Sequence, residues 1–195
     1  VDRAWHLFQE AESKGLPITL DTYNQLLSTL TLRKNGTRER YALLIEMLKK
    51  IQTDNLQVNV KTLNSALKVA VQTVRHESAM EICRDIFTEF KAVGVVPSLG
   101  SFYHALIVFY RKADANSPPS CLLREIIDEL EARDELKVED TSDTYFFTLA
   151  MDVATNSLQD PVLANRIHKL LLADNNYKLI GDGFKENLYY RNFCR

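Results

Sequence analysis

Three basic side chains at a regular spacing are the residues of this sequence best suited to meet a charged partner. Lys61, Lys68 and Arg75 recur every seven residues, nearly two turns of an α-helix, so on a helix they share one face. Asn64 lies on the same stretch, and its amide can both donate and accept hydrogen bonds. Because ammonium and guanidinium groups neutralise phosphates, this face is a candidate phosphate track. Three charges are equally typical of an ordinary solvated helix face, and that alternative stays open.

Residues that could carry catalysis or hold a metal ion show no matching spacing. His76-Glu77 would need a second His at position 80 to form a zinc-binding helix, and Met80 stands there. The glycines around Asp182 lack the strand and helix of a phosphate-binding loop. Three cysteines lie far apart and never in a C-x-x-C pair, which favours a reducing or organellar interior over a disulfide framework. We therefore expect no catalytic residue, metal, cofactor or small-molecule substrate.

The composition is that of a globular chain outside the membrane. Its 195 residues are 46% hydrophobic and 26% charged, enough to bury a core and too polar for a membrane-embedded protein. Apolar runs stay short of the roughly 18 residues that cross a bilayer, so we expect no membrane span. The chain opens inside a helical pattern, with apolar residues at Ala4, Leu7, Phe8 and Ala11. We expect a fragment whose targeting peptide would lie upstream.

A repeated helical pattern positions the basic residues. The segments TYNQLL, TLNSAL, SFYHAL and TYFFTL begin at Thr22, Thr62, Ser101 and Thr144, so their starts are separated by 40, 39 and 43 residues. Each is followed by a second amphipathic stripe, so each period predicts a helical hairpin. One hairpin cannot bury both of its apolar faces, and neighbours must stack. The predicted fold class is all-α, an α-solenoid of stacked helix-turn-helix repeats with a concave side.

The repeat boundaries follow from this period. Asp160-Pro161 marks a helix start, because the carboxylate can cap the helix and Pro at the first position loses no hydrogen bond. We predict one solenoid fragment over residues 1–195. Its parts are a partial repeat 1–18, full repeats 19–59, 60–98, 99–141 and 142–174, and the start of a further unit at 175–195.

The net charge of −2 is divided unevenly between first and second helices. First helices carry a net +4 when they are taken as 21–34, 60–75, 99–112 and 142–155. Second helices carry −6 when they are taken as 1–14, 37–54, 76–92, 118–135 and 160–174. The inner helices of the solenoid are thus basic and the outer ones acidic. The acidic run from Glu125 to Glu135 is typical of a solvated outer face or a contact for basic proteins, because one helix spreads its carboxylates around its side.

The boundaries between hairpins resemble a known repeat family. The stretches GLPITLDTYNQLL at 15–27 and GVVPSLGSFYHALI at 94–107 resemble the G-x-x-P-x-x-x-T-Y-N-x-L-I signature of pentatricopeptide repeat proteins, with the proline of the first stretch shifted by one. A tetratricopeptide repeat would instead require Trp and a Leu-Gly pair in the first helix, and neither is present. The stretch from Ala164 to Phe193 is similar to a family member found in the mitochondrial small ribosomal subunit.

The resemblance implies that the first helices bind RNA. In this family the residue after the aromatic position acts together with the last residue of the repeat, which gives the pairs Asn24 with Asn59 and Asn64 with Ser98. The third and fourth repeats present Tyr103 and Phe146 instead, which could stack on bases but provide no hydrogen-bond code. Structural roles for these residues stay open as alternatives to RNA contact. The asparagines could satisfy backbone groups near helix starts, and the aromatics could belong to the core.

The resemblance also implies a location and partners. It indicates a mitochondrial matrix protein of the small ribosomal subunit that binds single-stranded RNA or rRNA and neighbouring ribosomal proteins during translation. Two alternatives stay open, a free organellar RNA-binding factor for transcript processing or stability, and a helical scaffold that binds only proteins.

Overall fold

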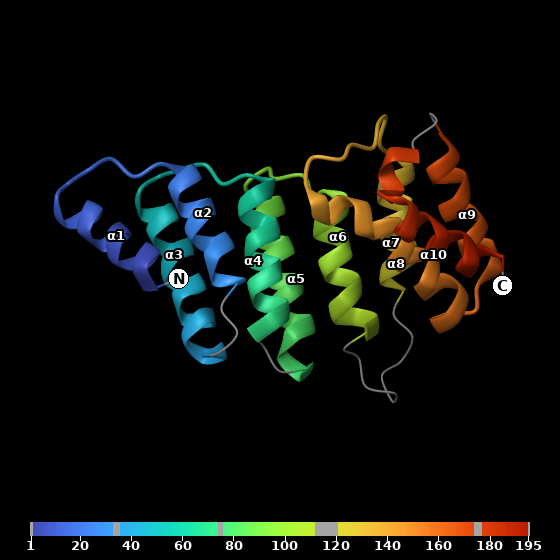
Figure 1. Ribbon diagram of the computed structural model, residues 1–195, viewed down its shortest axis with the longest axis horizontal. Helices are drawn as coiled ribbons and strands as arrows, with labels where there is room; N and C mark the ends of the chain where they lie inside the picture. Colours follow the sequence, from blue (N-terminus) through green and yellow to red (C-terminus); the bar gives the residue numbers. More distant parts are fainter. Residues whose placement is uncertain (1, 33–35, 74–75, 112–120, 174–176, 195) are drawn as a thin grey trace. The chain divides into compact units, whose positions relative to one another are not determined.

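Helices make up the ordered secondary structure of this protein (Figure 1). The structure is a computed structural model that describes residues 2–32, 36–73, 76–111, 121–173 and 177–194. No strand occurs in these ranges, and none of their helices is both long and apolar enough to cross a bilayer. The chain forms two compact units, Val1–Val96 and Pro97–Arg195, and each is described by itself. The division into five repeats stays a prediction.

Unit 1 is built from helices that follow the predicted alternation of first and second helices. In its described part these are α1 (Asp2–Ser13), α2 (Leu20–Leu30), α3 (Thr37–Thr53), α4 (Val60–Thr73) and α5 (His76–Ala92). Helix α2 packs on α3, and α4 packs on α5, so each pair is a helical hairpin. Helix α4 also contacts α2 and α3, while α1 lies against α2 (Figure 1). The first helix of the second hairpin therefore packs against both helices of the first hairpin.

Left-handed residues end the second helices of unit 1. Gly15 and Gly94 have φ of 64° and 88°, and Asn55 takes the same conformation at 52°. The next N–H then bonds back to the last turn, as from Leu16 to the carbonyl of Ala11 at 3.0 Å. Such a terminus satisfies carbonyls that the helix leaves unpaired and turns the chain toward the next first helix. The Gly-containing breakers of the sequence are thus helix C-termini.

Unit 2 has more irregular helices. Its described elements are α6 (Leu99–Leu106) with the π-helical turn η1 (Ile107–Arg111), α7 (Leu122–Glu131), the 3₁₀ turn η2 (Thr141–Tyr145), α8 (Phe146–Asp152) with the π-helical turn η3 (Val153–Ser157), α9 (Pro161–Leu172), η5 (Tyr177–Ile180) and α10 (Gly183–Phe193). Helix α6 contacts α7, η2 and α8, while α8 contacts α9 and α10. The predicted first helix at 142–155 is therefore a 3₁₀ turn, an α-helix and a π-helical turn in succession.

Each unit buries its own apolar core between these helices. In unit 1, Tyr23 and Leu27 of α2 and Leu63 and Leu67 of α4 are fully buried. The Tyr23 hydroxyl reaches the end of α3, where it donates a 2.7 Å hydrogen bond to Asp54 Oδ2. In unit 2, the core includes side chains of α7, α8 and α9, among them Ile127, Phe146, Phe147 and Ile167. The stripes that the sequence assigns to first and second helices are the ones that face each other.

A buried carboxylate joins η2 to α6 in unit 2. Asp143 is fully buried, and its side chain accepts hydrogen bonds from the backbone N–H groups of Gly100, Glu139 and Asp140 at 2.6, 2.8 and 2.9 Å. A Cβ at Gly100 would lie 2.8 Å from Asp143 Oδ1 and 3.1 Å from Ser142 Cβ. Since real Cβ atoms do not approach this closely, the absence of a side chain at Gly100 is what lets η2 approach α6.

Candidate RNA-binding face

The starts of the first helices share one geometry, which aligns the repeats by structure. A polar residue before each helix accepts a hydrogen bond from the backbone N–H three residues later. The capping residues are Thr19, Asn59, Ser98, Asp140 and Asp182. The residues three positions later are Thr22, Thr62, Ser101, Asp143 and Lys185. Corresponding positions on different first helices can be read from this register.

Asn24 and Asn59, predicted to act together, are in contact in unit 1. Asn24 Nδ2 donates to Asn59 Oδ1 at 3.2 Å, and Asn24 Oδ1 accepts from the Thr62 hydroxyl at 2.7 Å. Asn59 Oδ1 also accepts from the N–H of Thr62 at 3.2 Å, as the cap of α4. The network therefore links α2 to the start of α4. Thr62, which the sequence pattern treats only as a helix-start residue, is the missed member of this site.

The two asparagines of this network differ in exposure. Asn24 is only 8% exposed and already uses both ends of its amide, whereas Asn59 is exposed. A buried amide whose donor and acceptor are both hydrogen-bonded within the protein positions its neighbours and has little capacity left for a ligand. This arrangement supports the reading in which Asn24 satisfies polar groups near a helix start. Asn59 is the member of the pair that presents an amide to solvent.

The second predicted pair, Asn64 and Ser98, falls in different units. Asn64 is 7% exposed on α4 of unit 1 and, like Asn24, belongs to the buried polar residues. Ser98 caps α6 of unit 2: its N–H donates to the Ser101 hydroxyl at 3.0 Å, and its own hydroxyl accepts from the Ser101 N–H at 3.4 Å. This reciprocal capping box fixes the start of α6. A joint role of Asn64 and Ser98 stays a prediction.

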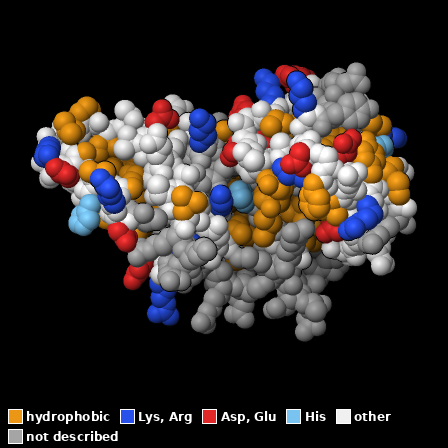
Figure 2. Space-filling model, in the orientation of Figure 1, with side chains coloured by type: hydrophobic (Ala, Val, Ile, Leu, Met, Phe, Trp, Pro, Cys, Tyr) orange, Lys and Arg blue, Asp and Glu red, His pale blue; other side chains and the backbone are white. Residues whose placement is uncertain are grey.

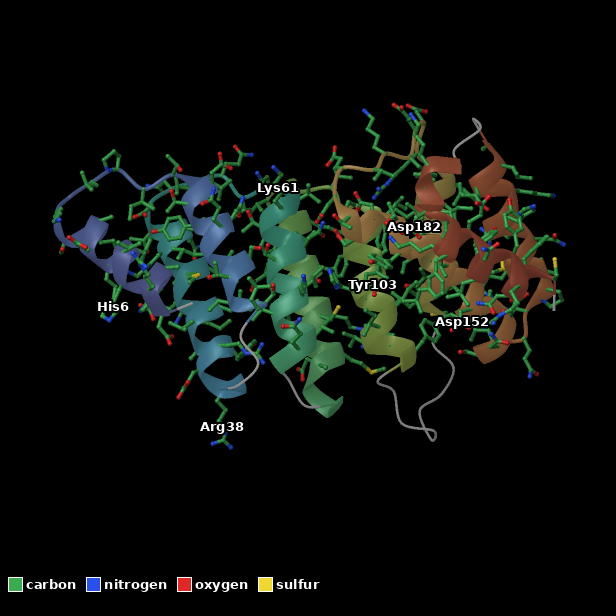
Figure 3. All side chains as sticks on the ribbon, in the orientation of Figure 1. His6, Arg38, Lys61, Tyr103, Asp152 and Asp182 are labelled. Atoms are coloured by element: carbon green, nitrogen blue, oxygen red, sulfur yellow. The ribbon has the colours of Figure 1, made fainter. Side chains whose placement is uncertain are left out.

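Two of the three predicted basic residues lie exposed on α4. Lys61 is in its first turn, as Figure 3 shows, and Lys68 lies nearly two turns further along. The side chain of Arg75 lies outside the described residues. Asn64, between the two lysines in sequence, is buried, so the exposed part of this face is cationic without an accompanying amide. The geometry fits a contact to phosphates better than a contact to base edges on α4.

The prediction that Phe146 could stack on a base is wrong. Phe146 is fully buried and packs against Phe147, with ring centroids 5.3 Å apart in a T-shaped arrangement. The cap at Asp140 shows why: the fourth first helix begins one residue earlier than its TYFFTL pattern indicates. The position that corresponds to Asn24 and Tyr103 is therefore Tyr145, which is 41% exposed. The signal for this register was the Asp140-x-x-Asp143 capping pattern.

Tyr145 takes part in a small aromatic and cationic cluster in unit 2. Its ring centroid lies 5.5 Å from that of Tyr103, with an angle of 30° between the planes. Lys185 Nζ, from the first turn of α10, lies 3.7 Å from the Tyr145 ring centroid and donates to the Thr144 hydroxyl at 2.9 Å. We call Tyr103, Tyr145 and Lys185 the tyrosine–lysine cluster. Three successive first helices contribute one member each.

The acidic surface of α7 is engaged by arginines within unit 2. Arg166 of α9 bridges Asp128 and Glu131 of α7, with a 2.8 Å contact to Glu131. Arg124 pairs with Asp160 at 2.5 Å, and the pKa of Asp160 is lowered by the N–H of Leu163 and then by Arg124. Asp160 caps α9 as predicted, accepting from Leu163 N at 3.0 Å with Pro161 at the first helical position. These contacts hold the second helices α7 and α9 together.

The side chains that could do covalent or metal chemistry are dispersed. Burial raises the pKa of the Cys83 thiol to about 12, so this thiol stays protonated and is a weak nucleophile. Cys121 and Cys194 are exposed and far from it in sequence. Among the described residues, no group of three or more His, Cys, Asp or Glu side chains could hold a metal ion. In contrast to these dispersed side chains, the polar residues at the starts of the first helices share a common geometry.

Comparisons with known proteins agree with this architecture. A family model, the pentacotripeptide-repeat region of PRORP, matches residues 1–141. The chain is 35% identical over 192 residues to a Drosophila melanogaster protein named small ribosomal subunit protein mS39, covering 98% of this chain and 29% of that protein. Proteins of the same name from Xenopus laevis and Mus musculus are 32% and 31% identical, each over 98% of this chain and 28% of theirs. The chain thus spans less than a third of these relatives.

A solved structure has the same fold. The PPR domain of Arabidopsis thaliana protein-only RNase P 1, solved in complex with tRNA, superimposes with a TM-score of 0.60 and 20% identity. The match covers 99% of this chain and 90% of that one. At this identity the likeness concerns the fold alone. It confirms the predicted fold class, an all-α solenoid of helical repeats.

Proposed function

Because this chain belongs to the pentatricopeptide-repeat family, we propose that it is a non-catalytic, RNA-binding part of a mitochondrial small-ribosomal-subunit protein and acts in translation. The observation that carries the proposal is the similarity over 98% of the chain to proteins named small ribosomal subunit protein mS39. A second support is the family match itself, because stacked helical repeats form extended surfaces suited to binding RNA or protein. The setting would be the mitochondrial matrix.

The RNA contact proposed for unit 1 lies at the start of α4. Asn59 presents its amide there, held by Asn24 and by the cap of α4, and Lys61 lies two residues further on. An amide held by hydrogen bonds next to an exposed ammonium suits a base edge and its neighbouring phosphate. In this proposal Asn59 contacts RNA directly and Asn24 acts through it. Lys68 extends the phosphate contact along α4, and the partner is single-stranded RNA or rRNA.

Protein contacts are proposed for the acidic second helix α7. Asp128 and Glu131 remain 65% and 41% exposed at the side chain although Arg166 pairs with both. Basic neighbouring proteins of the small subunit are complementary to this surface. The same observation favours the second candidate function, a helical scaffold that binds proteins without RNA. A free RNA-binding factor for transcript processing or stability is the third.

Sedimentation of the full-length protein from mitochondrial extracts separates these functions. We expect the protein to sediment with the small ribosomal subunit and to yield RNA crosslinks there. Sedimentation only at the top of the gradient, with RNA crosslinks retained, would instead identify a free factor. Association with the subunit without any RNA crosslink would identify a protein scaffold.

The paired variants Lys61→Gln and Lys68→Gln test the phosphate contact of α4. Each lost contact should weaken binding of short single-stranded RNA at low salt and reduce the slope of log affinity against log salt by about 0.7. Lys50→Gln, on the second helix α3, is a matched control, since Lys50 already pairs with Glu12 at 2.7 Å. If the Lys61/Lys68 double variant binds RNA with the affinity of the parent at every salt concentration, α4 does not contact the RNA phosphates.

A further inference from the structure

An aromatic and cationic surface in unit 2 includes Tyr103, which the repeat pattern already assigns to base stacking, and two residues that the pattern does not assign. Its members are Tyr103 of α6, Tyr145 of η2 and Lys185 of α10, the tyrosine–lysine cluster. Figure 2 shows hydrophobic side chains gathered over α6 and the neighbouring η2–α8 segment, with basic side chains beside them. Tyr103 is labelled on α6 in Figure 3. The structural register puts Tyr103 and Tyr145 at the position that Asn24 occupies in unit 1.

We propose that the tyrosine–lysine cluster is a base-stacking site for single-stranded RNA that tolerates any base. A base would stack on the exposed Tyr145 ring, and the Lys185 ammonium would pair with the adjoining phosphate. This inference rests on the proposed RNA-binding function and locates part of it in unit 2. It differs from the amide contact at Asn59, because an aromatic face offers no hydrogen-bond pattern that distinguishes one base from another.

The Tyr145 ring is held in place yet accessible. The ring is 41% exposed, although Tyr103 lies 5.5 Å away at a 30° angle and Lys185 lies over it at 3.7 Å. A large apolar ring kept at the surface loses the stabilisation that burial would give it. Its two neighbours fix its orientation, so a base that stacks on it loses little entropy to ordering the ring.

The Lys185 ammonium is placed where it can meet a phosphate. Among the described residues, Lys185 Nζ contacts the Thr144 hydroxyl, to which it donates a hydrogen bond, and the Tyr145 ring, and neither contact neutralises its charge. An ammonium has three donors, so this group can pair with a phosphate oxygen without leaving Thr144. Stacked bases in a single strand are joined by phosphates, and a cation held over part of an aromatic ring can meet the phosphate next to a base that stacks on the exposed remainder of that ring.

Tyr145 contrasts with the aromatic residue that follows it in sequence. Phe146 is fully buried, so the chain places one ring of this pair in the core and the other at the surface. The 3₁₀ geometry of η2, fixed by the buried Asp143, sets this division. A purely structural role for Tyr145 would not require its ring to remain exposed beside an unneutralised cation.

The test compares RNA binding of the full-length protein and its variants, with fluorescently labelled oligo(U), oligo(A) and oligo(C) as probes. Tyr145→Ala should weaken binding to each of the three about 5- to 150-fold, the loss of one stacked base. Tyr145→Phe should bind as the parent does, because the ring is kept. Phe184→Ala is the matched control: Phe184 is the residue before Lys185, is 78% exposed and lies outside the cluster, so its loss should leave affinity unchanged.

A salt titration tests the cation separately. Lys185→Gln should reduce the slope of log affinity against log salt by about 0.7, and Lys185→Arg should restore it. Thermal unfolding of every variant identifies any variant that has lost its fold. The comparisons of Tyr145→Phe and Lys185→Arg with the parent remain valid even if Tyr145→Ala does not fold.

Three outcomes would overturn the inference. If the parent binds the probes and Tyr145→Ala binds them equally well, the stacking site is wrong while the proposed RNA function stands. If Tyr145→Ala loses sedimentation with the small subunit but keeps its RNA affinity, the cluster contacts a protein. If the parent binds none of the three probes, the proposed RNA function fails together with the inference.

Discussion

At the scale of single residues, the starts of the first helices depend on small polar side chains with several tasks at once. Thr62 shows this most clearly: its N–H is capped by Asn59, and its hydroxyl donates to Asn24 on the neighbouring helix. The acceptor on Asn24 is buried, so it depends on this donor. One hydroxyl therefore contributes to the capping of α4, to the contact between α2 and α4, and to the position of the Asn59 amide.

We expect Thr62→Val to destabilise the protein by about 1–3 kcal/mol, because the isosteric change leaves the buried Asn24 Oδ1 without its donor. Thr22→Val is the matched control, since Thr22 holds the same position on α2 but is exposed, with its hydroxyl 3.2 Å from that of Thr19. Thr22→Val should lower the free energy of unfolding by less than about 0.5 kcal/mol. Urea unfolding of both variants measures the difference, and equal costs would contradict the role given to Thr62.

At the scale of elements, the junction of α6 with η2 depends on a position without a side chain. The Gly100 N–H donates to Asp143 at 2.6 Å, and the same carboxylate holds two N–H groups at the start of η2. This contact places η2 so that Tyr145 stays exposed while Phe146 enters the core.

We expect Gly100→Ala to destabilise unit 2 by about 1–3 kcal/mol, since the new methyl group would collide with Ser142 and Asp143. Gly183→Ala is the matched control at the start of α10. Its Cβ would meet nothing within 4 Å, and alanine favours the helix, so this variant should be neutral or more stable. Thermal unfolding distinguishes the two, and a neutral Gly100→Ala would show that η2 can move away from α6 without loss.

The cap of α9 gives a prediction about pH. The pKa of Asp160 is lowered by the Leu163 N–H and by Arg124, so its charge stabilises the folded state above the unfolded pKa of about 3.9. That contribution is lost as the pH falls through the lower, folded pKa. Asp160→Asn keeps the capping oxygen and removes the charge, so the parent should be more stable near pH 7. The difference in unfolding free energy should shrink below about pH 4, and a difference that is constant down to pH 2 would contradict it.

Much of this element structure follows from sequence patterns, and the exceptions have physical reasons. The periodic apolar stripes predicted the first and second helices up to α9, because burial of a stripe dominates helix placement, whereas α10 was predicted only as the start of a further unit. The register of Phe146 was missed because η2 is a 3₁₀ turn capped by Asp140, and its tighter winding shifts the exposed position to Tyr145. The burial of Asn24 was not predictable from its polarity, since it depends on a partner on another helix, Thr62 of α4.

At the scale of the whole molecule, the charge distribution is consistent with a helical repeat that faces two kinds of partner. The net charge is only −2, so nonspecific attraction to RNA cannot supply high affinity by itself. Within the described residues, α4 carries the exposed lysines Lys61 and Lys68, and α7 carries the exposed carboxylates of Asp128 and Glu131. The proposed RNA contact on α4 and the proposed protein contact on α7 therefore carry opposite charges.

The central claim is that this part of the protein contacts RNA within the mitochondrial small ribosomal subunit. The most direct measurement is ultraviolet crosslinking of the full-length protein in intact mitochondria, followed by isolation of the small subunit and identification of crosslinked peptides and RNA. The account predicts crosslinks to rRNA or mRNA in peptides that contain Asn59 and Lys61, and in peptides that contain Tyr145. Crosslinks confined to the second helices α3, α5, α7 and α9, or their complete absence from this chain in purified subunits, would contradict it.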